Sequence, residues 1–278
     1  MHKSFTLHIS IVTYDTARDT LLRTLESVVV AVEKLERLKP FIGVDITLVN
    51  NSQKNSIDLD EFNTLLLGSG ATQCKLHLME GHANIGYGRG QNMAFFAHRS
   101  TFHLFMNPDV ELEPDCLMEG ITYLETHIDV AIASPHARNY EGQKQFLCKQ
   151  YPTVWILLVR GFIPKSLRGI FGKQIKHYEM QNLSESIPTK KIPLVSGCFM
   201  LCRSDIIEKV SGFDPQYFLY FEDFNLSLRV GDISTLAYVP SMRITHAGGY
   251  AAKKGMRHVK LFIKSGYRFF SEHGWKWA

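Results

Sequence analysis

Apolar and polar positions recur with two different periods near the start of the chain, and they predict a strand followed by a helix. Phe5 to Tyr14 reads FTLHISIVTY, a run rich in β-branched residues that is typical of a strand. Asp15-Thr16 can cap a helix. Aliphatic residues between Leu21 and Leu35 then recur at three- and four-residue spacing, which predicts one apolar helix face, and Pro40 ends the pattern.

The same alternation continues to residue 138. Further strands are predicted at 44–49, 76–79, 102–106 and 130–134, with helices ending at Ala97 and covering 115–125; the polar stretch 53–73 predicts a loop with at most one helix. Strands alternating with helices predict an α/β fold with a mainly parallel sheet. Such sheets bind ligands beyond the carboxyl ends of their strands, so the polar segments 14–15, 50–51 and 107–109 form one candidate site.

The pattern weakens after residue 138. Residues 139–191 mix basic, aromatic, proline and glycine residues without a clear period. Beyond them, LVSGCFMLC at 194–202 predicts one strand, a helix is expected from Glu222 to Val230, and short strands are expected at 235–239 and 242–245. The tail from residue 255 carries apolar residues at helical spacing among cations, which predicts a basic amphipathic helix.

The composition is that of an ordinary globular protein. The chain has 278 residues, of which 45% are apolar and 21% charged, so it is neither disordered nor collagen-like. Its longest aliphatic or aromatic run covers residues 154–159, whereas a spanning helix needs about 20 residues. The N-terminus lacks the apolar block of a signal peptide, so we expect a cytoplasmic location. Five cysteines without a CxxC favour buried thiols over a disulfide framework.

Positive charge is concentrated in two segments. Residues 138–191 contain ten Lys or Arg and three acidic residues, and residues 243–278 contain eight and one, so each segment has a net charge of +7, while the whole chain has only +4. Two basic blocks on an otherwise acidic protein indicate an anionic partner. Charge alone leaves open a nucleic acid, a membrane surface or a phosphorylated substrate. No nucleic-acid reading motif is recognisable, so we expect no nucleic-acid partner.

Candidate metal ligands follow two predicted strands. Asp109, with Asn107 before it and Glu111 after it, lies where an apolar strand stops, and its carboxylate could hold Mg²⁺ or Mn²⁺ beside a diphosphate. The alternative is a simple Pro-Asp turn. His246 could bind the same ion if the fold brings it to Asp109; otherwise it is a hydrogen-bonded structural histidine.

Three further segments have a functional and a structural interpretation. Glu222 and Asp223 are adjacent carboxylates whose repulsion would raise a pKa towards that of a general base, or they cap a helix. The glycines at 86, 88 and 90 could place helix N-terminal amides near a phosphate, or they only form a tight turn. Residues 151–176 could lie on a bilayer, or they pack into the core.

Taken in order, seven segments resemble family 2 glycosyltransferases of the GT-A fold, nearest to the bacterial rhamnosyltransferase-like branch. The resemblance covers about residues 5–250 and rests on SIVTY at 10–14, VNNS at 49–52, residues 84–92, MNPDV at 106–110, SGCFM at 196–200, GFD at 212–214 and FLYFEDFNLSLR at 218–229. It implies transfer of a sugar from a nucleotide-diphosphate donor with inversion at the anomeric carbon.

The resemblance also implies roles for individual residues. Asp109 takes the place of the metal-binding aspartate, with His246 as a second ligand for Mg²⁺ or Mn²⁺, and Asp223 takes the place of the catalytic base, with Glu222 beside it. The remaining matched positions belong to the nucleotide-sugar site and are Thr13, Tyr14, Asn51, Gly86, Arg89, Asn92 and Asn107. Asn107 replaces the first aspartate of the family's DxD-type motif, which leaves fewer charges on the metal.

The expected organisation is a GT-A domain over residues 1–250 and a basic amphipathic helix over 251–278. Within the domain, 1–138 would bind the nucleotide-sugar, 139–191 is a basic and aromatic insertion, and 192–250 is the acceptor and catalytic half.

The expected donor is dTDP-rhamnose or a UDP-sugar. The expected acceptor is a glycan or polyprenyl-linked glycan in cell-surface polysaccharide biosynthesis, and the basic blocks are expected to lie on the inner membrane face. Alternatives are a sugar-nucleotide nucleotidyltransferase or a non-catalytic nucleotide-sugar-binding relative.

Overall fold

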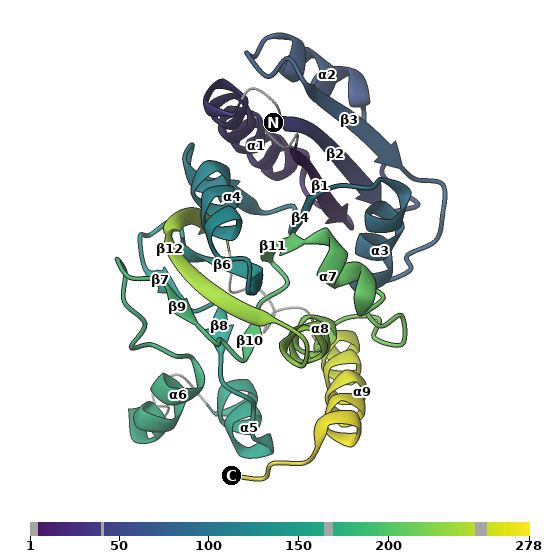
Figure 1. Cartoon of the computed structure of the whole chain (residues 1–278). Helices are drawn as coiled ribbons and strands as arrows, with labels where there is room; N and C mark the ends of the chain where they lie inside the picture. Colours follow the sequence, from purple (N-terminus) through teal and green to yellow (C-terminus); the bar gives the residue numbers. More distant parts are fainter. Residues whose placement is uncertain (1–4, 40–41, 164–168, 248–254) are drawn as a thin grey trace.

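A ten-stranded sheet runs through the molecule and carries helices on both faces (Figure 1). The computed structural model describes residues 5–39, 42–163, 169–247 and 255–278. The principal strand order is β3-β2-β1-β4-β11-β6-β12-β5, with β7 paired to β6 and β9 to β12. This confirms the expected α/β class with a mostly parallel sheet.

The parallel half of the sheet comes from the N-terminal part of the chain. It contains β1 (Phe5–Thr13), β2 (Ile42–Asn50), β3 (Cys74–Met79) and β4 (Phe102–Met106), with β1 paired in parallel to β2 and β4. Every residue of β1 from Leu7 to Thr13 is buried. Because both faces of such a strand are covered, it reads as a continuous β-branched run in the sequence.

The other half of the sheet is mixed. β11 (Phe199–Arg203) lies antiparallel between β4 and β6 (Val130–Arg138), and β12 (Thr235–His246) is parallel to β6 and antiparallel to β5 (Val110–Leu112). The remaining strands are two residues long: β7 (Lys144–Gln145) and β9 (Thr189–Lys190) join the main sheet, while β8 (Cys148–Lys149) and β10 (Leu194–Val195) pair with each other.

Helices on the two faces enclose two separate hydrophobic clusters. On one face α1 (Arg18–Leu38) and α4 (Cys116–Thr126) pack against the sheet, with α2 (Leu59–Leu67) beside α1. On the other lie α3 (Tyr87–Ala97), α7 (Ser204–Lys209) and α8 (Glu222–Gly231). The apolar face predicted for α1 is confirmed, since Leu21, Leu25, Val28, Val32 and Leu35 are all buried.

Two strand predictions are wrong in detail. The segment 194–202 is not one strand, because it turns at residues 196–198 between β10 and β11. The segments 235–239 and 242–245 are one strand, β12, whose pairing with β6 shifts register between Val239 and Arg243. Pro240 lies at that shift, and a proline cannot donate a ladder hydrogen bond, which is why the pattern there looked interrupted.

The C-terminal part of the chain packs beside α8 (Figure 1). Helix α9 (Gly255–His273) is followed by a tail that returns to α5 (Val154–Phe162), where the amide of Val154 donates to the carbonyl of Lys276 (2.8 Å). The predicted C-terminal helix is therefore present, but it ends at His273, and residues 274–278 of the predicted range 251–278 form the tail. Among the described residues, one further helix, α6 (Gly172–Tyr178), follows α5. In the part of the chain that the structure describes, no helix has the length and apolarity to cross a membrane. The division at residue 250 stays a prediction, and Gly248 and Gly249 lie outside the described residues.

Candidate active site

The structure brings Asp109 and His246 together although they lie far apart in the sequence. Asp109 precedes β5 and His246 ends β12, and these strands pair so that His246 lies opposite Val110. The Nε2 atom of His246 is 3.6 Å from Oδ1 of Asp109, and the amide of Ala247 donates to the Asp109 carbonyl (3.2 Å). The sheet pairing therefore fixes the distance between the two side chains.

Gln145 determines which nitrogen of His246 faces Asp109. Its Nε2 donates to the backbone carbonyl of His246 (2.9 Å), so its Oε1 is left to accept from Nδ1 of the ring (2.8 Å). This assigns the proton to Nδ1 and leaves the Nε2 lone pair directed at Asp109. Partners of this kind orient metal-binding histidines. Gln145 comes from β7, within the segment 139–191 that has no readable period.

The turn at residues 196–198 connects this pair to Asp223. The carboxylate of Asp223 accepts a hydrogen bond from the amide of Gly197 (2.8 Å), and the amide of Asn107 donates to the carbonyl of Cys198 (2.9 Å). Burial raises the pKa of the Cys198 thiol to about 12, and the nearby charges of Asp109 and Asp223 act in the same direction. The three positions on which the sequence prediction depends, 109, 223 and 246, thus gather around one turn.

Glu222 and Asp223 are chemically unequal although they are neighbours. Glu222 is buried and Asp223 is half-buried at the start of α8, and desolvation raises both pKa values. Asp223 accepts hydrogen bonds from the amides of Gly197 and Phe224, which favour its charged form. Within the described residues, Oε2 of Glu222 has no hydrogen-bond partner, and the charge of Asp223 raises its pKa further. A proton shared by the pair therefore resides on Glu222, and Asp223 carries the charge.

The backbone that presents these carboxylates is strained. Tyr220 and Phe221 have φ of 70° and 65°, a left-handed conformation that bulky side chains rarely adopt. Helix α9 holds them there: the ring of Phe221 packs 5.1 Å from Phe262 and 5.3 Å from Phe269, and the hydroxyl of Tyr220 is 2.8 Å from Nδ1 of His258. Each such residue costs about 1–3 kcal/mol unless the surroundings impose it. The C-terminal helix therefore positions the carboxylates of α8.

A cavity of about 410 Å³ opens at the carboxyl ends of β1 and β2. Thr13 and Asn50 line it at the strand ends, and Asp15, Arg18 and Phe62 are among the residues of its walls. Neither Tyr14 nor Asn51 is among its lining residues: Tyr14 is exposed, and Asn51 donates to the carbonyl of Gly86 (3.1 Å). The cavity has the location that α/β sheets use for nucleotides.

The model of the family described as "Glycosyl transferase family 2" matches residues 9–211. The chain is a family 2 glycosyltransferase. The matched span contains the cavity, Asp109 and the 196–198 turn, while Asp223 and His246 lie beyond it.

Curated relatives have rhamnosyltransferase names. An N-acetylglucosaminyl-diphospho-decaprenol L-rhamnosyltransferase of Mycobacterium tuberculosis is 26% identical over 217 residues, which cover 72% of this chain and 69% of the relative. Rhamnosyltransferase WbbL of Escherichia coli K12 is 26% identical over 200 residues, covering 67% and 70%.

Solved structures share the fold at low identity. GalNAc-T7 with UDP, GalNAc and Mn²⁺ superposes with a TM-score of 0.63 at 13% identity, covering 98% of this chain, which spans about half (48%) of that protein. A fragment of S. aureus TarS, residues 1–349, gives 0.53 at 12% identity, covering 96% of this chain and 72% of the fragment. These likenesses concern the fold alone, and they confirm the expected GT-A architecture.

Three residues expected near the donor contact the segment that leads to Asp223. Gly86, at φ 89°, directly precedes α3 and approaches the carbonyl of Phe218. Arg89 donates to the carbonyl of Pro215 (2.7 Å), and Asn92 forms two hydrogen bonds with the backbone of Phe213 (2.7 and 2.8 Å). Their roles at the donor stay a prediction.

This glycosyltransferase has two side chains that could bind a divalent cation, but they are not a complete set of ligands. Asp109 offers carboxylate oxygens and His246 an imidazole nitrogen, both suitable ligands for Mn²⁺. Across residues 5–39, 42–163, 169–247 and 255–278, no group of three His, Cys, Asp or Glu side chains could hold a metal ion. A cation bound here would therefore need further oxygen ligands from water or a bound molecule.

Proposed function

We propose that this glycosyltransferase moves rhamnose from dTDP-rhamnose, with inversion, onto a polyprenyl-linked glycan used in cell-surface polysaccharide biosynthesis. The observation that carries the proposal is the convergence of Asp109, His246 and Asp223 around residues 197–198. The names of the mycobacterial and E. coli relatives support the sugar, and the mycobacterial name supports a diphosphate-linked lipid acceptor.

In this proposal Asp223 is the catalytic base. An acceptor hydroxyl becomes nucleophilic when a positioned carboxylate removes its proton, a contribution of about 10²–10⁴ in rate. The amides of Gly197 and Phe224 hold Asp223 in its charged form, and Glu222 retains the proton of the pair. One base acting in one displacement inverts the anomeric carbon.

Asp109 and His246 would hold Mg²⁺ or Mn²⁺ together with the donor. When bound, the cation offsets the charge that the departing nucleoside diphosphate gains. Gln145 keeps the Nε2 lone pair of His246 available for it. Thr13 and Asn50 line the cavity that would receive the nucleoside. Asn107, two residues before Asp109, would also contact the donor.

We further propose that the enzyme is cytoplasmic and works at the inner membrane face. The support is the concentration of cations with exposed aromatic residues in the last helix and tail, where Tyr267 and Trp277 are exposed. Flotation with vesicles of phosphatidylcholine and phosphatidylglycerol tests this location. A protein that stays entirely in the soluble fraction would contradict it.

Substitution of the base tests the proposed reaction. Asp223→Asn should lower the rate of transfer by at least about 10²-fold because the amide cannot accept the proton. Donor binding, followed by thermal shift with dTDP-rhamnose or a UDP-sugar and Mn²⁺, should stay close to wild type. Wild-type turnover in this variant would remove the assignment, and release of no nucleoside diphosphate by the wild-type enzyme with any acceptor would favour a non-catalytic binding role.

A further inference from the structure

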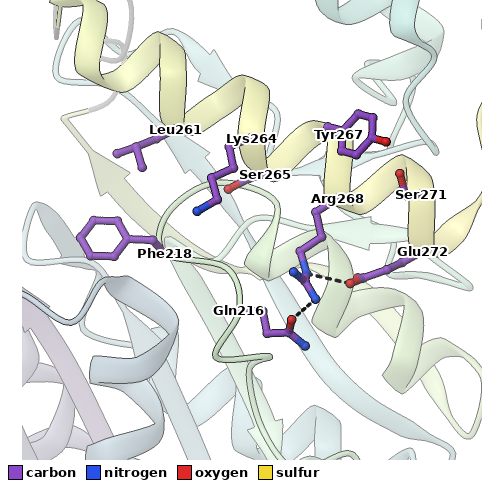
Figure 2. A pocket seen from close by; sticks show the side chains of 9 residues that line it. All are labelled: Gln216, Phe218, Leu261, Lys264, Ser265, Tyr267, Arg268, Ser271 and Glu272. Atoms are coloured by element: carbon purple, nitrogen blue, oxygen red, sulfur yellow. Dashed lines mark hydrogen bonds and ion pairs between the residues drawn. The ribbon is translucent and has the colours of Figure 1, made fainter.

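A second cavity, of about 390 Å³, lies between α9 and the segment 216–218 (Figure 2). Lys264 and Arg268 extend from α9 towards that segment, which contributes Gln216 and Phe218 to the lining. Ser265 and Tyr267 also line the cavity. It is separate from the cavity at β1 and β2, with which it shares no lining residue.

The two cations of this cavity are not equally engaged. Arg268 forms an ion pair with Glu272 (2.7 Å) and donates to the side chain of Gln216, and Glu272 also accepts from the hydroxyl of Tyr217 (2.6 Å). Lys264 forms neither an ion pair nor a hydrogen bond with any described residue. Its ammonium group therefore supplies the uncompensated positive charge of the cavity, and an anion fits there.

An exposed apolar stripe begins beside this cavity. Met256, Val259, Ile263 and Tyr267 are spaced three, four and four residues apart, which places them on one face of α9, and they are 71%, 38%, 59% and 66% exposed. Trp275 packs 5.7 Å from Tyr267 and extends the aromatic surface into the tail. Apolar side chains exposed in a row beside cations are typical of surfaces that contact lipid.

The cavity is close to the proposed base through a short stretch of backbone. The carbonyl of Leu219 accepts from the Ser265 hydroxyl (2.8 Å), and two residues further on, Phe221 packs under α9 and precedes Glu222 and Asp223. The carbonyl of Phe218 accepts from the amide of Tyr87 (3.1 Å) at the start of α3. The segment 216–221 therefore lies between the start of α3 and this cavity.

We propose that the cavity binds the diphosphate of a polyprenyl-diphosphate acceptor, with Lys264 contacting the anion and the isoprenoid chain lying along Met256, Val259, Ile263 and Tyr267. Charge complementarity selects this ligand, because an uncompensated ammonium group adjoins an apolar stripe and a diphosphate-linked lipid has the same two parts in the same order. Only one part of this proposal rests on the proposed function, namely that the lipid carries a sugar that accepts the transferred residue.

Direct binding tests the cavity without requiring sugar transfer. Farnesyl diphosphate and farnesol are titrated against the full chain by tryptophan fluorescence, in EDTA and with excess UDP so that the nucleotide site does not contribute. We expect Lys264→Gln to weaken farnesyl diphosphate binding about tenfold, the loss expected for one charge-assisted contact, and to leave farnesol binding unchanged. Lys264→Arg should restore it. Lys75→Gln, at an exposed lysine of β3, is the matched control and should bind as wild type.

A second pair of variants tests the stripe. Ile263→Ser should weaken both ligands, whereas Ile128→Ser, at another exposed isoleucine, should weaken neither. Equal binding of farnesyl diphosphate by wild type and Lys264→Gln would overturn the proposal, as would equal affinity of the wild type for the diphosphate and the alcohol. If Lys264→Gln reduced sedimentation with phosphatidylglycerol vesicles and left farnesyl diphosphate binding intact, the anion would be a phospholipid headgroup, and the acceptor site would be refuted.

If farnesyl diphosphate binds as expected and no acceptor is glycosylated, the proposed function fails while the cavity assignment stands. The opposite combination, transfer to a lipid-linked acceptor that Lys264→Gln leaves unaffected, refutes the cavity and keeps the function.

Discussion

Gly86 is the position where a single methyl group should disturb catalysis most clearly. It is the N-cap residue of α3 and has φ 89° and ψ 170°, a region of backbone conformation that only glycine occupies readily. A Cβ atom at Gly86 would lie 2.3 Å from the carbonyl oxygen of Phe218, which accepts a hydrogen bond from the Tyr87 amide. Gly86→Ala therefore perturbs the segment that leads to Asp223.

The size of the effect follows from these distances. Carbon–oxygen contacts in proteins are about 3.3 Å at their closest, so the Phe218 carbonyl would have to move by about 1 Å. Backbone strain adds about 1–3 kcal/mol of destabilisation. A misplacement of about 1 Å at a catalytic group can cost about 10²-fold in rate. We therefore expect kcat to fall by about 10²-fold in Gly86→Ala, with a lower melting temperature.

The control separates strain from displacement. Gly81 has nearly the same φ, 86°, but nothing lies within 4 Å of a Cβ placed there. Gly81→Ala should lose stability by a similar amount and keep its kcat within about twofold of wild type, measured as nucleoside diphosphate release at saturating donor and acceptor. If Gly86→Ala keeps wild-type kcat, or if both variants lose activity equally, the contact with Phe218 does not position the base.

The remaining predictions concern the metal ligands and the carboxylate pair. Gln145→Ala should raise the Mn²⁺ concentration needed for half-maximal activity severalfold, because the His246 ring becomes free to rotate. Asp109→Ala should abolish the stimulation of activity by Mn²⁺, because the variant lacks a metal ligand. A titration of initial rates with Mn²⁺ checks both predictions. Glu222→Gln should keep kcat within about tenfold of wild type, because the amide resembles the protonated acid. The pKa of Glu222 is raised in the folded state, so the wild-type fold loses stability as the pH rises above 4.5 towards that raised pKa. The variant has no carboxyl group at this position and does not show this loss. Between pH 5 and 8, the melting temperature of the variant should therefore rise relative to that of the wild type. Parallel melting curves would contradict the assignment of the proton to Glu222.

Local pattern was sufficient for much of the fold. The β-branched run of β1 and the aliphatic spacing of α1 each reflect one element buried on a predictable face, so their bounds could be read within a few residues. Predictions were wrong where a strand turned or changed register, at 196–198 and at 239–243, because those events depend on pairing with β6 and β8.

Some residues of the candidate site could be identified from the sequence, and others only from the folded structure. Asp109, Asp223 and His246 could be selected from the sequence because each follows or begins a predicted element and has a side chain suited to metal or proton chemistry. Gln145 could not be, because its partner His246 is 101 residues away and glutamine in a segment without periodicity carries no chemical signal. The contacts by which α9 holds Tyr220 and Phe221 could not be predicted either, because they too join distant parts of the sequence.

By itself, the sequence determined which elements form and which side chains could do chemistry, since periodicity and residue type are local properties. Only the tertiary structure decided that the proton of the carboxylate pair belongs to Glu222 and that Phe262 and Phe269 hold the turn before it. Those facts arise from burial and from hydrogen bonds between distant segments, and both exist only once the chain has folded.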